Sequence, residues 1–472
     1  MDFQEAMGWV EEDHVFPKEP GAFHSKRFDW LLRETGLALD LRSVPLAVVA
    51  GSCGKASTAR FLAHIAARAG LRVVLGTKPP LQETPEGNLE RYQVSGPGGF
   101  RWLSPEEFRE RVAELRPAVT RLHLEKPELG LPAPYELRAW ILARTAVVQG
   151  AGLAVVEANM GLRLDPAGAL PAPEVTLLTP VGTDHGALLK PPEGYRPELG
   201  ERSGPFWHKV GGVHPDSPLV VGRQDPGVQA ALPRADRLFG QHFDYFEARC
   251  TLSGSQAFLR LGGEVRPIRL ITPGAFQLEN AAHAAAAADV LHSRGLLPGL
   301  REAFWTAVQE GLAVTETPGR MQVLARRPAV ILAVATSPEK LEGLLASLDH
   351  LLPASGRLYV CATFLDRIHR LSEAVRTVLA FPRTRQLLVT RFLDDEVNRD
   401  LNPETLGGLE RIEPVATPRE AMDRALKEAG AEDLILLLGN GMAAALASGA
   451  LTIPVAPAAR CGPCHPPDPG DR

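Results

Sequence analysis

A short glycine-rich segment at residues 51–58 carries the residue types that bind phosphate groups. Glycines let backbone N–H groups close around phosphate oxygens, the ammonium group of Lys55 can reach the outer phosphates, and the hydroxyl group of Ser57 can bind Mg²⁺. The segment departs from the generic P-loop pattern, because Val49 replaces a glycine and Ala56 follows the lysine. An ordinary glycine-rich turn is the alternative. The candidate nucleotide-binding residues here are Gly51, Ser52, Gly54, Lys55, Ala56, Ser57 and Thr58.

The sequence around this segment predicts a parallel α/β sheet. An apolar run at residues 45–50 predicts a buried strand that ends in the glycine-rich turn, and residues 57–70 predict the helix that follows. The alternation of short β-branched runs with longer helical patterns is typical of parallel strands joined by helices. Further strands are expected at residues 71–75, 153–157, 174–179 and 219–221, and an alanine-faced helix at 278–293.

A Pro-containing stretch at residues 315–320 indicates a hinge, because the strand–helix alternation restarts after it. The predicted fold class is α/β, with a P-loop parallel-sheet ATPase domain followed by a smaller doubly wound, Rossmann-like C-terminal domain. In that second domain, strands are expected at residues 329–334, 357–361, 386–389 and 433–438, with a helix from Pro338. The predicted boundaries are 1–314 for the ATP-binding domain, 315–320 for the hinge, 321–456 for the C-terminal domain and 457–472 for a disordered tail.

The tail contains Cys461 and Cys464 in the sequence Cys-Gly-Pro-Cys-His, which has the spacing of a redox dithiol and of a c-type haem attachment site. Neither context is expected, since the motif follows no βα unit and the N-terminal sequence does not resemble a signal peptide. The Pro and Gly content of this segment favours a disordered tail instead.

Composition and charge narrow the range of functions. The 472 residues are 45% hydrophobic and 23% charged, and the formal net charge of −5 gives no basis for a nucleic-acid or membrane surface. No uncharged apolar stretch reaches the ~18 residues that a membrane span needs. The sequence therefore predicts a cytoplasmic monomer that binds small molecules, and neither nucleic acid nor a membrane.

The glycine-rich segment resembles the phosphate loop Gly-Thr-Asn-Gly-Lys-Gly-Ser of the Mur ligase superfamily, in its folylpolyglutamate synthase and dihydrofolate synthase branch. Ser52, Cys53 and Ala56 stand in place of Thr, Asn and Gly of that loop. Further motifs resemble those of the family in the same order, so that the resemblance extends over about residues 3–439. They are Glu157 to Asp165, Thr183-Asp184-His185, His208-Lys209-Val210-Gly211, Gln277-Leu278-Glu279-Asn280 and Pro318-Gly319-Arg320.

This resemblance implies a role for each matching residue. The residues implied to hold magnesium are Ser57, Glu157 and His185. Lys209 matches the lysine that is carbamylated in the family. The residues implied to contact adenine are Gln277 and Asn280. Arg320 would reach the nucleotide phosphates from the hinge, because a guanidinium fork binds oxyanions through two hydrogen bonds. The implied catalytic residues are Lys55, Lys209 and Arg320.

Two motifs depart from the family pattern. Where the second domain of the family has Asp-Gly-Ala-His-Asn-Pro, this chain has Ala333 in place of the Asp and Thr336 in place of the His. Where the family has Thr-Ser-Pro-His-Leu, Lys78 replaces the Ser, and an ammonium group cannot bind Mg²⁺ as a hydroxyl group can. These departures leave the predicted fold unchanged and bear on the reaction.

The resemblance implies an ATP-dependent ligase that joins a carboxylate to an amine through an acyl phosphate, with ATP and Mg²⁺ as cofactors. The implied partners are a small-molecule carboxylate, folate-like by analogy, and an amino acid. Two alternatives stay open at this point. One is a degenerate homologue that binds nucleotide in a regulatory or scaffolding role without forming amide bonds. The other is a ligase that acts on a carboxylate other than folate.

Overall fold

The chain folds into two compact units in the computed structural model. The first unit comprises residues 1–318 and 337–348, and the second comprises residues 319–336 and 349–472. The predicted tail at 457–472 lies outside the described residues. The residues that the structure describes are 1–11, 25–81, 84, 86–184, 186, 189–335, 337–365, 371–393, 400–406 and 411–453.

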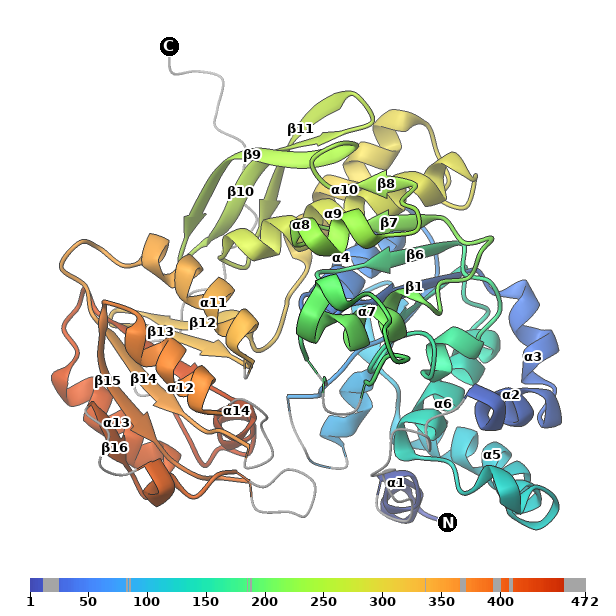
Figure 1. The fold of residues 1–472 in the computed structure, drawn as a ribbon, viewed down its shortest axis with the longest axis horizontal. Helices are drawn as coiled ribbons and strands as arrows, with labels where there is room; N and C mark the ends of the chain where they lie inside the picture. The colour runs from blue at the N-terminus through green and yellow to red at the C-terminus, as the bar shows by residue number, and fades with distance from the viewer. Residues whose placement is uncertain are drawn as a thin grey trace. The chain divides into compact units, whose positions relative to one another are not determined.

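An eight-stranded sheet forms the centre of the first unit (Figure 1), in the order β4-β3-β2-β5-β1-β6-β7-β8. All neighbouring strands from β2 to β8 in this order are parallel, whereas β3 and β4 continue the sheet as antiparallel strands. This arrangement confirms the predicted parallel α/β fold of the first domain. The strands are β1 (Leu46–Ala50), β2 (Val73–Gly76), β3 (Tyr92–Gly96), β4 (Gly99–Trp102), β5 (Leu153–Glu157), β6 (Val175–Leu178), β7 (Leu219–Val221) and β8 (Arg237–Leu238).

Strand β1 is buried on both faces, because alternate side chains of its Leu-Ala-Val-Val-Ala run enter two different cores. Leu46 and Val48 face a core shared with α2 (Ser25–Glu34), α5 (Pro105–Glu125) and α6 (Pro134–Val148). Ala47 and Val49 face a core shared with α4 (Lys55–Arg68), α9 (Ala275–Ser293) and α10 (Arg301–Val314). Other helices of this unit are α1 (Phe3–Glu11), α3 (Leu37–Asp40), α7 (Ser203–Val210) and α8 (Pro226–Ala231).

Small residues allow α4 to pack closely against its neighbours. The alanines of α9 at residues 281–288 are fully buried against the sheet and α4. On α10, a Cβ atom added at Gly311 would lie 2.7 Å from the backbone nitrogen of Ile65 in α4, which is closer than side chains tolerate. The helix that follows the glycine-rich loop is therefore held between two helices at short range.

A three-stranded antiparallel sheet, which the sequence analysis did not anticipate, covers α9 and α10 of the first unit. Strands β10 and β11 are joined by Gly262 and Gly263, which both have positive φ, as a two-residue hairpin turn requires. Alternate residues of β10 are buried, which is the pattern of a sheet with one solvated face. The strands are β9 (Phe243–Thr251), β10 (Gly254–Leu261) and β11 (Glu264–Leu270).

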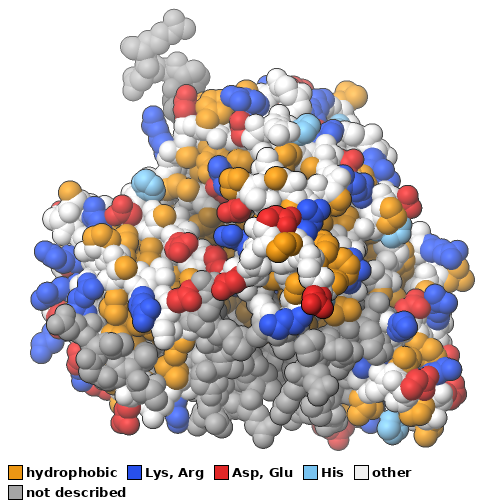
Figure 2. Space-filling model, viewed as in Figure 1, with side chains coloured by type: hydrophobic (Ala, Val, Ile, Leu, Met, Phe, Trp, Pro, Cys, Tyr) orange, Lys and Arg blue, Asp and Glu red, His pale blue; other side chains and the backbone are white. Residues whose placement is uncertain are grey.

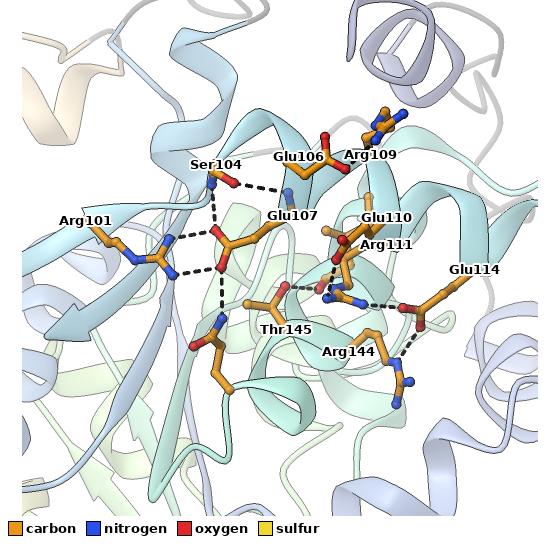
Figure 3. A network of polar contacts seen from close by, with 12 residues as sticks. Arg101, Ser104, Glu106, Glu107, Arg109, Glu110, Arg111, Glu114, Arg144 and Thr145 are labelled. Carbon is orange, nitrogen blue, oxygen red and sulfur yellow. Dashed lines mark hydrogen bonds and ion pairs between the residues drawn. The ribbon is translucent and has the colours of Figure 1, made fainter. Parts of the chain in front are cut away.

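A polar network ties the start of α5 to β4 and α6 (Figure 3). The hydroxyl group of Ser104 accepts a hydrogen bond from the N–H of Glu107, and the Glu107 carboxylate accepts one from the N–H of Ser104, which forms a capping box. Arg101 of β4 donates to both oxygens of Glu107 at 2.7 Å. Hydrogen bonding to Arg101 lowers the pKa of Glu107 to about 2. The helix start is therefore fixed by charge as well as by its cap.

The second unit contains a six-stranded sheet in the order β12-β13-β17-β14-β15-β16, parallel except for the antiparallel pair β12–β13. The crossovers between parallel strands confirm the predicted second α/β domain. Its strands are β12 (Arg320–Arg326), β13 (Ala329–Ala333), β14 (Leu358–Ala362), β15 (Thr384–Val389), β16 (Ile412–Pro414) and β17 (Leu434–Leu438). Its helices are α12 (Leu371–Ala380), α13 (Pro418–Glu428) and α14 (Asn440–Ala447), whereas most of α11 (Pro338–Leu351) belongs to the first unit.

Basic and acidic side chains are interspersed among apolar ones on the face of the molecule that Figure 2 shows. Within the described part of the chain, no helix has both the length and the apolar character needed to cross a membrane.

A buried histidine in α9 predicts a pH-dependent stability of the first unit. The ring of His283 is 2% exposed, and its Nε2 atom lies 2.9 Å from the carbonyl oxygen of Val220. Burial lowers the pKa of His283 to about 4 from 6.5. Between these pH values the His283 side chain binds more protons in the unfolded chain than in the native chain. Its contribution to the free energy of unfolding is therefore fully present above pH 6.5 and is lost as the pH falls toward 4. The loss should approach about 3 kcal/mol.

We expect His283→Gln to remove this contribution, so that its free energy of unfolding falls less than that of the wild type between pH 7.5 and 4.5. All six tryptophans lie before residue 319, so tryptophan fluorescence during urea titration reports on the first unit. The exposed His123→Gln is the matched control and should keep the wild-type pH dependence. Equal pH slopes for wild type and His283→Gln would contradict the prediction.

Candidate functional site

The glycine-rich loop joins the end of β1 to the start of α4. Gly51 has φ of 130° and Gly54 has φ of 84°, a region of backbone conformation that side chains disfavour. A Cβ atom added at Gly51 would lie 2.6 Å from the carbonyl oxygen of Thr179, and one added at Gly54 would overlap the Oδ1 atom of Asn280. Only glycine therefore fits at both positions, and the loop ends at the N-terminus of α4, where N–H groups and the helix dipole favour an anion.

Lys55 begins α4 and folds back over the loop. Its Nζ atom donates hydrogen bonds to the carbonyl oxygens of Gly51 at 2.9 Å and Ser52 at 3.3 Å. The residues that follow in the first turn of the helix are almost fully buried, including Ser57 at 3% exposure. The ammonium group therefore lies on the loop itself, where a phosphate group could replace the carbonyl oxygens as its partner.

Asn280 brings α9 to the loop. Its Oδ1 atom accepts a hydrogen bond from the hydroxyl group of Thr58 at 3.4 Å, and its Nδ2 atom donates to Oε1 of Gln277 at 3.1 Å. Gln277 is fully buried and donates in turn to the hydroxyl group of Thr317, just before the second unit begins. The residues predicted to contact adenine therefore lie beside the loop. The side-chain amide of Gln277 forms its hydrogen bonds with Asn280 and Thr317.

Asp184 joins the loop to a buried lysine. The hydroxyl group of Ser52 donates to Oδ1 of Asp184 and accepts a hydrogen bond from the N–H of Gly182 at 2.8 Å. Both carboxylate oxygens of Asp184 accept from Nζ of Lys209 at 3.0 Å. Sequence analysis quoted Asp184 within its motif but gave it no role. Its signal was a carboxylate a few residues after the end of β6 (Val175–Leu178), the strand that neighbours β1.

Lys209 is fully buried on α7, and the chain after β5 holds this helix in place. The carbonyl oxygen of His208 accepts hydrogen bonds from the N–H groups of Leu162 and Arg163 at 2.8 and 3.0 Å. A Cβ atom added at Gly161 would lie 2.7 Å from the same oxygen. Burial lowers the pKa of Lys209 to about 8, and the charge of Asp184 opposes this shift. The lysine thus loses its proton more readily than an exposed lysine.

Glu157 ends β5 and contacts Lys78, which follows the end of β2. Its Oε2 atom accepts a hydrogen bond from the backbone N–H of Lys78 at 2.9 Å, while Nζ of Lys78 donates to the carbonyl oxygen of Asn159 at 2.7 Å. Burial lowers the pKa of Lys78 to about 7; the charge of Lys55 lowers it further, whereas the charges of Glu157 and Asp165 raise it. Glu157 and Lys78 therefore lie close enough to Lys55 of the glycine-rich loop for their charges to interact.

Asp165 shapes the turn after β5. Its carboxylate accepts hydrogen bonds from the N–H groups of Asn159, Met160 and Ala167 at 2.7, 2.9 and 3.0 Å. Burial raises the pKa of Asp165, and these backbone hydrogen bonds oppose the shift. The turn places the Asn159 carbonyl oxygen where Lys78 reaches it, so Asp165 supports the site without belonging to the predicted set.

Two of the remaining motif residues, His185 and Thr336, are outside the described residues. Arg320 begins β12 in the second unit, and Ala333 ends the neighbouring strand β13, where it is 2% exposed. Among the residues that the structure describes, no group of three or more His, Cys, Asp or Glu side chains is placed to hold a metal ion. The structure brings together the loop, Asn280, Asp184, Lys209, Glu157 and Lys78 in the first unit.

Comparisons with known proteins concern the family of the chain. Residues 319–441 match the family described as Mur ligase, glutamate ligase domain. The chain is 28% identical over 342 residues to a dihydrofolate synthase/folylpolyglutamate synthase of Mycobacterium tuberculosis, covering 69% of this chain and 67% of the relative. It is 27% identical over 435 residues to the dihydrofolate synthase/folylpolyglutamate synthase of Escherichia coli, covering 88% and 90% of the two chains.

Solved structures share the fold. Mycobacterium tuberculosis folylpolyglutamate synthase complexed with ADP matches with a TM-score of 0.75 at 23% identity, covering 95% of this chain and 99% of that one. An FPGS–AMPPCP–folate complex matches with a TM-score of 0.76 at 19% identity, covering 96% and 100%. The domain match and the curated relatives confirm the family that the motifs predicted. The glutamate ligase domain at residues 319–441 and the similarity along most of the chain support the Mur ligase superfamily, in its folylpolyglutamate synthase/dihydrofolate synthase branch.

Proposed function

We propose that this protein is an ATP-dependent ligase that joins a carboxylate to an amine. The observation that carries the proposal is the loop between β1 and α4, where Gly51 and Gly54 leave no room for side chains and Lys55 lies on the loop backbone. Such a backbone, at a helix N-terminus, suits the phosphate chain of a nucleotide. Relatives that carry the synthase names, and related structures with ADP and AMPPCP, support ATP as the substrate.

In the proposed reaction, a carboxylate oxygen attacks the γ-phosphorus of ATP, the bond to the β,γ-bridging oxygen breaks, and ADP leaves. The acyl phosphate is then attacked at its carbonyl carbon by an amine, which loses a proton as phosphate departs and an amide forms. Lys55 would hold the outer phosphate and stabilise the charge that gathers on the transferring group. We also propose that Lys209 is the carbamylated lysine of the family and that Arg320 contacts the nucleotide phosphates.

The loop residues Ser52, Ala56 and Thr58 would complete the nucleotide site beside Gly51, Gly54 and Lys55. Asn280 would orient the nucleotide from α9, since its side chain already borders Gly54, and Gln277 would position Asn280. We expect a division at 315–320, with the nucleotide mainly on the first domain and Arg320 contributed by the hinge, from the resemblance alone. The placement of Asn280 and Gln277 beside the loop supports their assignments.

Magnesium fits the site better at Ser57 than at Glu157. The Ser57 hydroxyl group lies in the first turn of α4, where a metal that accompanies ATP would meet it. The Glu157 carboxylate accepts the N–H of Lys78 and lies within the field of its ammonium group, which opposes a divalent ion. When bound, Mg²⁺ would neutralise phosphate charge, and we propose Ser57 as its ligand among the described residues.

The carboxylate substrate is proposed to be folate-like and the amine to be that of an amino acid, as the names of the relatives suggest. A second candidate is nucleotide binding without amide synthesis. It is favoured by Ala333, a buried methyl side chain at the end of β13, where the resemblance places a carboxylate. Losing one charged hydrogen bond would weaken the second domain's hold on nucleotide by about 1.5–3 kcal/mol.

The two candidates differ in product formation. The purified chain should be supplied with Mg-ATP, a panel of carboxylates that includes folates, and a panel of amino acids, followed by mass analysis of products and release of phosphate. We expect an amide product with at least one pair, and slow turnover with folate and glutamate because Ala333 and Thr336 lack the polar groups of the family motif. Tight ATP binding without product from any pair would favour the second candidate.

Replacing Lys55 tests the phosphate site. Lys55→Met keeps the apolar stem but removes the ammonium group that lies on the loop, so Mg-ATP affinity should fall by about tenfold to a hundredfold or more. Affinity is measured by calorimetry with a non-hydrolysable ATP analogue, and folding by thermal denaturation. The exposed Lys126→Met is the matched control and should bind like the wild type. If Lys55→Met bound Mg-ATP as tightly as the wild type, the proposal that the loop binds the phosphate chain would be contradicted.

Replacing Gly54 tests the loop backbone. Gly54→Ala places a methyl group against Asn280, whose side chain is held by Thr58 and Gln277, so the loop must shift and nucleotide binding should be lost. Gly70→Ala has the same kind of positive φ, at 93°, with open space around it. It should cost about 1–2 kcal/mol of stability and leave binding unchanged. Binding that survives in Gly54→Ala would show that the close approach is not needed.

A further inference from the structure

Lys78 is anchored at both ends to the strand that carries Glu157. Its backbone N–H donates to Oε2 of Glu157 at 2.9 Å, and its Nζ atom donates to the carbonyl oxygen of Asn159 at 2.7 Å. The strands β2 and β5 that bring them together are parallel neighbours, so their carboxyl ends meet at one edge of the sheet. The ammonium group is therefore held in place at this edge by the fold.

This edge continues into the phosphate loop. Glu157 pairs in register with Val49 of β1, two residues before Gly51, and the N–H of Ala158 donates to the carbonyl oxygen of Val49 at 3.0 Å. The charges of Lys55 and Glu157 both act on Lys78, one by repulsion and the other by attraction. Lys78 and the loop thus lie at the same carboxyl edge of the sheet, with β5 between the strands that carry them.

The positive charge of the Lys78 ammonium group, which Glu157 attracts, opposes a divalent ion at the same carboxylate. The ammonium group has no lone pair with which to ligate a metal, and its charge repels one. One oxygen of Glu157 already accepts a backbone hydrogen bond, which leaves fewer lone pairs for coordination. A positive charge supplied by the chain at this edge makes a metal ion held by Glu157 unnecessary for neutralising phosphate.

We propose that Lys78 serves as a built-in cation that holds an anionic oxygen of the nucleotide's phosphate chain, and that Glu157 positions Lys78 in place of holding a divalent ion. The proposal rests on the proposed function, because it requires nucleotide on the Gly51–Gly54 loop. It assigns Lys78 and Lys55 to opposite sides of the same phosphate chain. The metal that accompanies ATP is then bound by the phosphates and Ser57.

Manganese binding tests the role of Glu157. The full chain is saturated with AMPPCP, and bound Mn²⁺ is counted by electron paramagnetic resonance in the wild type and in Glu157→Gln. We expect a single bound Mn²⁺ in both, because the ion is held by the nucleotide and not by Glu157. A second Mn²⁺ in the wild type that disappears in Glu157→Gln would overturn the proposal, even if AMPPCP binds tightly to both proteins.

Nucleotide affinity tests the role of Lys78. Lys78→Ser removes the ammonium group and restores an oxygen ligand, so AMPPCP affinity at low Mn²⁺ should fall by about tenfold to a hundredfold. Raising Mn²⁺ should recover affinity in this variant, with an additional ion bound beside Glu157. The exposed Lys126→Ser should match the wild type throughout. Unchanged AMPPCP affinity in Lys78→Ser would overturn the proposal, whereas wild-type protein that binds no AMPPCP would contradict the proposed function itself.

Discussion

The close approach of the phosphate loop to β6 and α9 is the constraint on which the rest of the site depends. Gly51 lies against the backbone of Thr179, and Gly54 lies against the side chain of Asn280, so neither position accepts a Cβ atom. The approach is possible because α4 packs between α9 and α10 at positions occupied by alanine and by Gly311. Packing behind the loop thus fixes the position of its backbone against Thr179 and Asn280.

Charges alternate along the carboxyl edge of the first sheet. Lys78, Glu157, Lys55, Asp184 and Lys209 come from the ends of β2, β5, β1 and β6 and from α7, and each lysine has a carboxylate or carbonyl oxygen as a partner. Burial of these lysines disfavours their charged forms, which the carboxylates partly offset. An edge of this kind is suited to a polyanion, because its cations lose little hydration when phosphate oxygens arrive.

The two units have diverged from the family motifs to different extents. The first unit keeps a loop, a buried lysine and carboxylates that are linked by hydrogen bonds. The second unit matches the glutamate ligase domain over residues 319–441, yet Ala333 supplies no polar group at the end of β13. The residues of the proposed nucleotide site therefore lie in the first unit, and the differences in the second unit concern the proposed joining of carboxylate and amine.

Local patterns in the sequence determined much of the fold. The strand before the loop, helix α4 and the restart of the alternation after Pro318 follow from hydrophobic period and turn residues within short stretches. The contacts of the site could not be predicted in this way. Ser52 and Asp184 are 132 positions apart, and Thr58 and Asn280 are 222 positions apart, so strand order and helix packing decide whether they meet. The tertiary structure alone placed the backbone N–H of Lys78 on Glu157 and its ammonium group on the carbonyl oxygen of Asn159, because both contacts depend on β2 and β5 being neighbours in the sheet.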